Sequence, residues 1–171
     1  MKSDSTELLA TLRARLAADP LWDFALAFYG RPGVEAACLH LQDDAGVDVL
    51  ELLWRLWLFR HGLAAGDFPE AIRQWQDEVT VPLRRLRRRL KAEAGKRESV
   101  AALRQRLKDA ELAAEREALV RLEALSLAGN AVHCLPSREV SLENVLPFCT
   151  RQQKKSHLSA LRRLKAQLDP S

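Results

Sequence analysis

The cationic side chains of residues 84–91 are the part of the sequence whose types and spacing point most clearly to a chemical role. Arginine or lysine occupies six of these eight positions. Like charges this close together along a helix repel one another, so the run is destabilising unless anions lie near it. The residues predicted to bind an anion are Arg84, Arg85, Arg87, Arg88, Arg89 and Lys91.

Two sources of negative charge fit this run. In one interpretation it is a solvated face, or it pairs with the acidic first half of the chain or with Glu111, Glu115 and Glu117 of the neighbouring helix. In the other it binds an anionic partner: a nucleic acid, an acidic protein or an anionic lipid surface. A nucleic acid would be held mainly through its phosphates, because the run has no aromatic residues on which bases could stack. The neighbouring leucines at 83, 86 and 90 are expected to be core residues.

An alternative site is predicted in residues 20–80, which contain all four tryptophans. Aspartates at 43, 44 and 48 have a spacing at which carboxylates hold Mg²⁺ on helical proteins, although helix capping explains them more simply. Asp23 lies among aromatic residues, where burial would raise the pKa of its carboxyl group. The residues of this alternative pocket are Trp22, Asp23, Tyr29, Asp43, Asp48, Trp54 and Trp57.

Other motifs for catalysis or cofactor binding are weak. His133, Cys134, Cys149 and His157 lack the short paired spacing of zinc ligands. The glycine-containing segment 62–66 lacks the lysine of a phosphate-binding loop. We therefore expect no catalytic residue, no bound metal and no cofactor, and the sequence favours a non-enzymatic protein.

Charge is distributed unevenly along the chain. The formal net charge is only +4. Residues 1–80 nevertheless contain 7 basic against 13 acidic residues, whereas residues 84–108 contain 11 against 2 and residues 151–168 contain 6 against none. The odd number of cysteines favours a reducing compartment. The N-terminal residues have no apolar stretch of signal-peptide length, and the apolar segment 49–59 is too short to cross a membrane. These features predict a cytoplasmic protein without a transmembrane segment.

The elements that must position these residues are predicted to be helices throughout. Asp48 opens an apolar central helix that runs to about residue 60, and Glu51 and Arg55 are spaced to pair on it. A long helix follows Pro69, with a kink expected near Thr80–Pro82 because Pro82 has no backbone N–H. After Gly95 a second long helix is predicted over 98–127, and an amphipathic helix over 157–168.

The predicted fold is therefore all-α: an irregular helical bundle with a long basic antiparallel helical hairpin. We expect a single domain over residues 1–171. It would comprise a compact apolar half (about 20–80), the hairpin (about 82–128) and a basic C-terminal segment (129–171). Self-association along the long helices is compatible with this arrangement.

A series of motifs runs over about residues 20–91. They are the segments Leu21-Trp22-Asp23-Phe24, Tyr29-Gly30-Arg31-Pro32-Gly33-Val34, Leu41-Gln42-Asp43, Gly46-Val47-Asp48-Val49 and Leu53-Trp54-Arg55-Leu56-Trp57-Leu58, then Trp75 and Val81-Pro82-Leu83-Arg84-Arg85-Leu86-Arg87. These motifs resemble those of an uncharacterised bacterial protein family, a domain of unknown function found in short cytoplasmic helical proteins. The resemblance implies no activity.

The function expected from the sequence is that of a non-enzymatic binding or regulatory protein, whose basic helices engage a nucleic acid or an acidic protein. The alternative is a small-molecule-binding or enzymatic protein that uses the aromatic, acid-bearing pocket. The two differ in what they need from the structure. The first needs cations that the fold itself does not neutralise, and the second needs a concave site in which acids converge.

Overall fold

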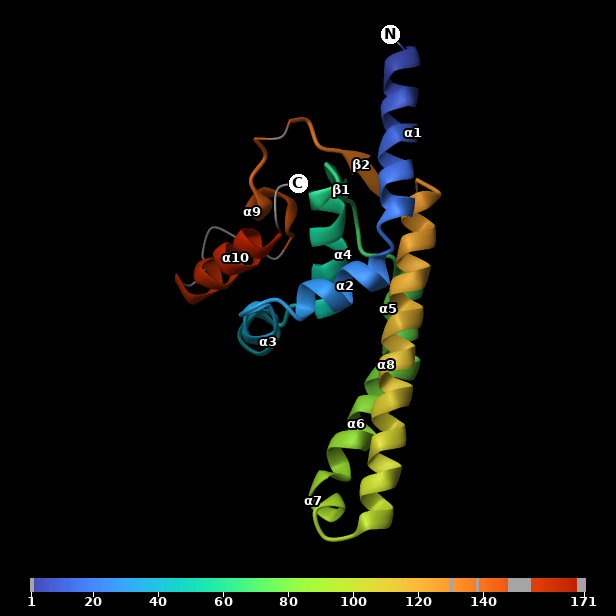
Figure 1. Ribbon diagram of the computed structural model, residues 1–171, viewed down its shortest axis with the longest axis vertical. Coiled ribbons are helices and arrows are strands. Elements are labelled where there is room, and N and C mark those ends of the chain that lie inside the picture. Colours follow the sequence, from blue (N-terminus) through green and yellow to red (C-terminus); the bar gives the residue numbers. More distant parts are fainter. Residues whose placement is uncertain (1, 130, 138, 148–154, 169–171) are drawn as a thin grey trace. The chain divides into compact units, whose positions relative to one another are not determined.

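The computed structural model describes residues 2–129, 131–137, 139–147 and 155–168. Within them the fold is all-α, as predicted, with a single two-stranded sheet added to the helices (Figure 1). The chain divides into two compact units. Unit 1 comprises residues 1–67 and 123–171, and unit 2 comprises residues 68–122.

Unit 1 is built around the apolar helix α4 (Val49–Arg60), the predicted central helix. From Leu50 to Leu58 every side chain except that of Glu51 is buried. Helix α4 contacts α2 (Leu21–Tyr29), α3 (Val34–Ala45), the short α9 (Leu142–Val145) and strand β1 (Leu63–Ala65). The remaining helices of the unit are α1 (Lys2–Ala18) and α10 (Lys155–Gln167), and the end of α8 (Glu98–Leu127) also belongs to it.

The start of α4 is stabilised by the predicted polar contacts. The Asp48 side chain accepts a hydrogen bond from the backbone N–H of Glu51 at 3.0 Å, which satisfies one of the free donors of the first turn. Gly46 closes the preceding helix α3 at a φ of 66°, in the left-handed region that favours glycine. These two features fix the chain direction between α3 and α4.

The structure contains two strands that the sequence did not predict, and the first of them contacts α4. Strand β1 (Leu63–Ala65) pairs antiparallel with β2 (Val132–Cys134), with Leu63 opposite Cys134. Each strand has only three residues, too few for an alternating pattern to be visible in the sequence. The buried Arg55 donates to the carbonyl oxygens of Ala65 (3.3 Å) and Gly66 (2.8 Å) and pairs with Glu51 at 2.8 Å, so it ties α4 to the end of β1.

The two buried tryptophans of α4 are satisfied at their polar atoms. Trp54 donates its indole N–H to the Ser126 hydroxyl at 2.9 Å, and Trp57 donates to the Asp19 carbonyl at 2.8 Å. Both rings are fully buried. Their size and their hydrogen bonds make them core residues of unit 1.

Unit 2 consists of consecutive helices that double back on one another. They are α5 (Glu70–Trp75), a π-helical turn η1 (Gln76–Thr80), α6 (Val81–Arg89), α7 (Lys91–Ala94) and the unit's part of α8 (Glu98–Leu127). The observed bounds of α8 are those predicted. The π turn lies where a kink was expected, because Pro82 removes a backbone donor and the wider turn absorbs that loss.

Helix α6 runs alongside α8 without a buried core. In residues 81–110, all of which the structure describes, no side chain is buried. Leu83 and Leu90 are half-buried and Leu86 is 44% exposed, so the prediction that these leucines are core residues was wrong. The buried apolar residues of unit 2 lie instead just before α5 (Phe68), on α5 (Ile72) and in the second half of its α8 segment, for example Leu119.

No helix among the described residues is both long enough and apolar enough to span a membrane. The longest helix, α8, carries charged residues along its whole length.

Replacing Arg55 with methionine should destabilise the protein by about 3 kcal/mol, because Glu51 and two backbone carbonyls lose a buried charged partner. Urea unfolding followed by tryptophan fluorescence measures the change. Arg162→Met, at an exposed position on α10, is the matched control and should cost less than about 0.5 kcal/mol. Equal losses in the two variants would contradict the structural role of Arg55.

Candidate functional site

The basic run lies on α6 and divides between two faces of that helix. On the inner face, toward α8, Arg84 donates to Glu111 at 2.8 Å and to Glu115 at 2.7 Å. Arg87 also donates to Glu111. Glu111 is buried and so receives two guanidinium groups at once. We call Arg84, Arg87, Glu111 and Glu115 the Arg–Glu cluster.

The Arg–Glu cluster shifts the pKa values of its acids in opposite directions. Burial alone would raise the pKa of Glu111, but hydrogen bonds from Arg87 and Arg84 outweigh it and hold the pKa below its ordinary value. For Glu115, burial outweighs the attraction of Arg84 and raises the pKa. Of the two acids in the cluster, Glu111 is therefore the one whose ionised form is more strongly favoured.

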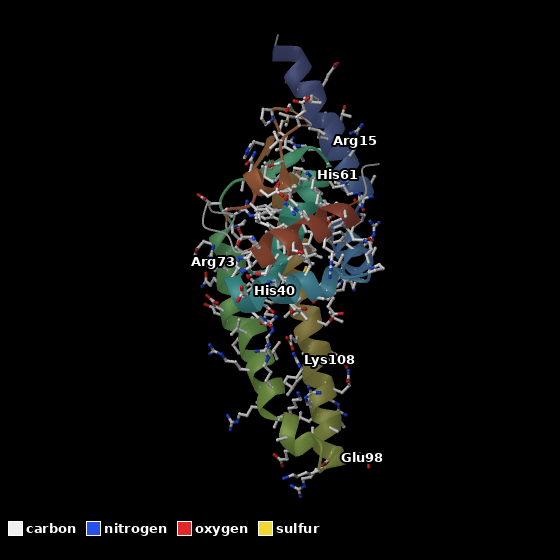
Figure 2. The ribbon with its side chains drawn as sticks, turned by 90° about the vertical axis from the view of Figure 1, so that its left-hand side faces the viewer. Arg15, His40, His61, Arg73, Glu98 and Lys108 are labelled. Carbon is white, nitrogen blue, oxygen red and sulfur yellow. The ribbon has the colours of Figure 1, made fainter. Side chains whose placement is uncertain are left out.

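The outer face of α6 carries the remaining cations of the run. Arg85, Arg88, Arg89 and, just beyond α6, Lys91 are exposed, and none of them has an ion pair with any described residue. At 3.6 residues per turn, the three arginines fall within an arc of about 100°. We call Arg85, Arg88 and Arg89 the outer arginines. On α8, Arg106 and Lys108 are also exposed; Figure 2 draws the side chains as sticks and labels Lys108.

The first interpretation of the run, neutralisation within the fold, therefore holds for Arg84 and Arg87, whereas binding of an anionic partner stays a prediction. Glu111 and Glu115 neutralise Arg84 and Arg87, as the first interpretation expected. The third predicted acid, Glu117, pairs instead with Arg121 on its own helix at 2.8 Å. Arg121 lies over the ring of Trp75 at 4.1 Å, and Trp75 donates to the carbonyl of Ala114, so these contacts fasten α5 to α8.

The structure places the residues of the alternative pocket in different environments. Trp54 and Trp57 are buried in the core, and Asp48 caps α4. Asp23 and Asp43 are exposed, which removes the burial expected for Asp23. Trp22 and Tyr29 are half-buried on α2. None of these residues lines the pocket between α3 and α10 or the pocket beside α1.

The cysteines in the described residues show no reactive environment. Burial, with a smaller contribution from nearby Glu35, raises the pKa of the Cys38 thiol to about 12. A thiol with such a pKa is almost entirely protonated at neutral pH and packs as a small hydrophobe. Cys134 is half-buried on β2, and Cys149 lies outside the described residues.

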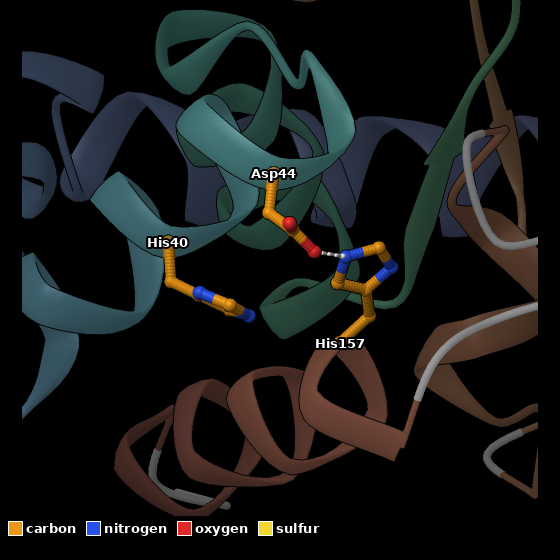
Figure 3. A group of neighbouring side chains, drawn as sticks. All are labelled: His40, Asp44 and His157. Carbon is orange, nitrogen blue, oxygen red and sulfur yellow. Dashed lines mark hydrogen bonds and ion pairs between the residues drawn. The ribbon is translucent and has the colours of Figure 1, made fainter.

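A group that the sequence did not predict lies between α3 and α10. His40 and Asp44 project from neighbouring turns of α3, and His157 projects toward them from the start of α10 (Figure 3). Asp44 and His157 are hydrogen-bonded at 2.5 Å, and the rings of His40 and His157 are 5.7 Å apart. The spacing of His40 and Asp44 on one helix face was visible in the sequence. The approach of His157, 113 residues from Asp44, was not.

Comparison with known protein families gives a match that covers the greater part of the chain. Residues 20–122 match the model of DUF2390, described as a protein of unknown function. The chain belongs to this family. The DUF2390 match includes all of unit 2 and helices α2 to α4 of unit 1, and it extends the resemblance seen in the sequence beyond residue 91. No curated protein and no solved structure matches the chain.

Replacing Glu111 with glutamine should loosen the packing of α6 on α8, because two arginines lose their shared anion. We expect the backbone amides of α6 to exchange hydrogen at least about tenfold faster at pH 7, a loss of about 1.4 kcal/mol or more. Asp109→Asn, two residues away and exposed, is the matched control and should leave exchange unchanged.

The difference in stability between the wild-type protein and Glu111→Gln should depend on pH, and the direction of that dependence follows from the pKa of Glu111. Because the pKa of folded Glu111 lies below its ordinary value of 4.5, its contribution to stability is complete above that pH. The contribution disappears as the pH falls through the lower, folded pKa. The difference between wild type and Glu111→Gln should therefore be constant near neutrality and shrink below pH 4.5. A difference that grows on acidification would contradict this assignment.

Proposed function

We propose that this DUF2390 protein is a non-enzymatic binding protein, whose outer arginines engage an acidic, leucine-bearing segment of a partner protein. The observation that carries the proposal is the exposure of three arginines on one face of α6 without an ion pair among the described residues. Their mutual repulsion is relieved when an anion binds, so the free protein retains electrostatic energy that favours a partner.

Exposed leucines beside the arginines favour a protein partner over a nucleic acid. Leu86 is 44% exposed and precedes Arg89 by three residues, so the two are neighbours on the helix surface. Leu103 is 48% exposed and precedes Arg106 on α8 with the same spacing. A phosphate backbone provides nothing for these leucines, whereas an amphipathic acidic helix provides both carboxylates and apolar side chains.

The absence of a buried core in residues 81–110 supports the same conclusion. A helix pair with only half-buried leucines gains stability when another apolar surface covers them. Residues 84–108 also contain no aromatic side chain on which a base could stack. Arginine suits such an interface because its planar guanidinium binds a carboxylate through two parallel hydrogen bonds.

The test uses the full chain and a synthetic amphipathic peptide of about 20 residues, with leucine at every third or fourth position and glutamate beside it. Fluorescence anisotropy measures its binding against a scrambled peptide of the same composition. We expect binding that weakens on the order of tenfold in Arg85→Gln/Arg88→Gln/Arg89→Gln and severalfold in Leu86→Ser alone.

The matched control removes the same net charge from unit 1. Arg15, Arg162 and Lys165 are exposed cations outside the hairpin, and their replacement with glutamine should leave peptide binding intact. A labelled DNA duplex and an RNA single strand form a second arm across a salt series. Tight, salt-sensitive binding of either that ignores Leu86 would favour the nucleic-acid form of the function. Binding of no probe would refute an anionic partner at this surface.

A further inference from the structure

His40, Asp44 and His157 bring three potential metal-ligand atoms together in unit 1. One ligand atom from each residue lies within 4.8 Å of the other two. His40 and Asp44 are four residues apart on α3 and therefore share a face of that helix. The third residue comes from the first turn of α10, the helix that packs along α3. Two rigid elements thus position the group.

One atom of the group lacks a partner. The Nε2 atom of His40 is buried and has no hydrogen bond with any described residue. Leaving a buried polar atom unsatisfied costs about 1–3 kcal/mol. The ring of His40 faces the Asp44–His157 pair (Figure 3). A cation between the three side chains would satisfy this nitrogen and at the same time be neutralised in part by the Asp44 carboxylate.

We propose that His40, Asp44 and His157 form a binding site for one divalent transition-metal ion of the Zn²⁺ type. Two imidazoles and one carboxylate suit zinc, iron and nickel, whereas Mg²⁺ and Ca²⁺ prefer oxygen ligands alone. Zinc binds such ligands at about 2.0–2.1 Å, which separates them by about 3.4 Å in a tetrahedron. Small side-chain rotations convert the observed spacings, 2.5 Å for Asp44–His157 and at most 4.8 Å overall, into that arrangement.

The site would leave coordination positions open. Three protein ligands are the set found in catalytic rather than structural zinc sites, with water in the fourth position. A pocket of about 240 Å³ between α3 and α10 is lined by His40 together with Ser156, Ser159 and Arg163. Because His40 belongs both to the pocket and to the ligand group, a small molecule in this pocket would lie near the ion. This inference is independent of the function proposed for the outer arginines.

Zinc binding by the metal-free full chain provides the test, measured by competition with a chromogenic chelator. We expect one ion per chain, with a dissociation constant in the micromolar range or tighter. His40→Gln, Asp44→Asn and His157→Gln should each weaken binding by at least about tenfold, because loss of a direct ligand costs no less than loss of the outer-shell group that orients it. Mg²⁺ should not compete. Circular dichroism of the variants without metal establishes that they remain folded.

The control variant removes two potential metal ligands outside the proposed site, the adjacent residues His133 and Cys134. His133 is exposed and Cys134 is half-buried on β2, and His133→Gln/Cys134→Ser should retain full zinc affinity. The Co²⁺ complex should show visible ligand-field bands without a thiolate charge-transfer band, because the proposed ligands are nitrogen and oxygen. The proposal would be overturned if no zinc bound at a concentration 100-fold above the expected dissociation constant. It would also be overturned if zinc affinity were unchanged in all three ligand variants.

Discussion

The buried carboxylate of Glu111 is the interaction on which the basic hairpin depends. It receives Arg84 and Arg87, two cations that would otherwise repel each other within one turn of α6. Burying an anion is costly unless it is fully paired, and two guanidinium groups with good geometry meet that cost. Because no side chain in residues 81–110 is buried, apolar packing alone holds α6 weakly against α8. The Arg–Glu cluster supplies the specific attachment of α6, and the contacts of Trp75 attach the preceding helix α5 to α8.

This arrangement also explains why the remaining cations are available. Glu111 and Glu115 face α6 and are engaged by its inner arginines, so they cannot reach the outer arginines on the other side of the helix. Unit 1 differs in kind. Its stability comes from a continuous apolar core around α4, and its charged contacts, such as those of Arg55, connect particular backbone segments. The same chain thus contains one unit stabilised mainly by burial of apolar side chains and a second unit stabilised largely by ion pairs.

Local patterns predicted much of the fold. The limits of α8, the Asp48 cap and the Glu51–Arg55 pair follow from interactions within four residues, which the sequence displays directly. The β1–β2 pairing joins segments about 70 residues apart and has no such local pattern. The leucines of α6 were wrongly assigned to the core, because helical spacing indicates a shared face but not what covers it. That Arg84 and Arg87 face acids while Arg85 and Arg88 do not depends on how α6 is rotated against α8, a tertiary property. The same limit hid His157, whose neighbours on α3 are distant in sequence.

The most direct test of the central claim is a double-mutant cycle between Arg87 and Glu111. Arg87→Met, Glu111→Leu and the double variant are compared through the free energy of opening of α6, obtained from amide hydrogen exchange. If the Arg–Glu cluster attaches α6 to α8, the double variant should lose less than the sum of the two single losses, with a coupling of about 1 kcal/mol or more. Additive losses, with coupling near zero, would mean that the two helices are held together by something other than these charges.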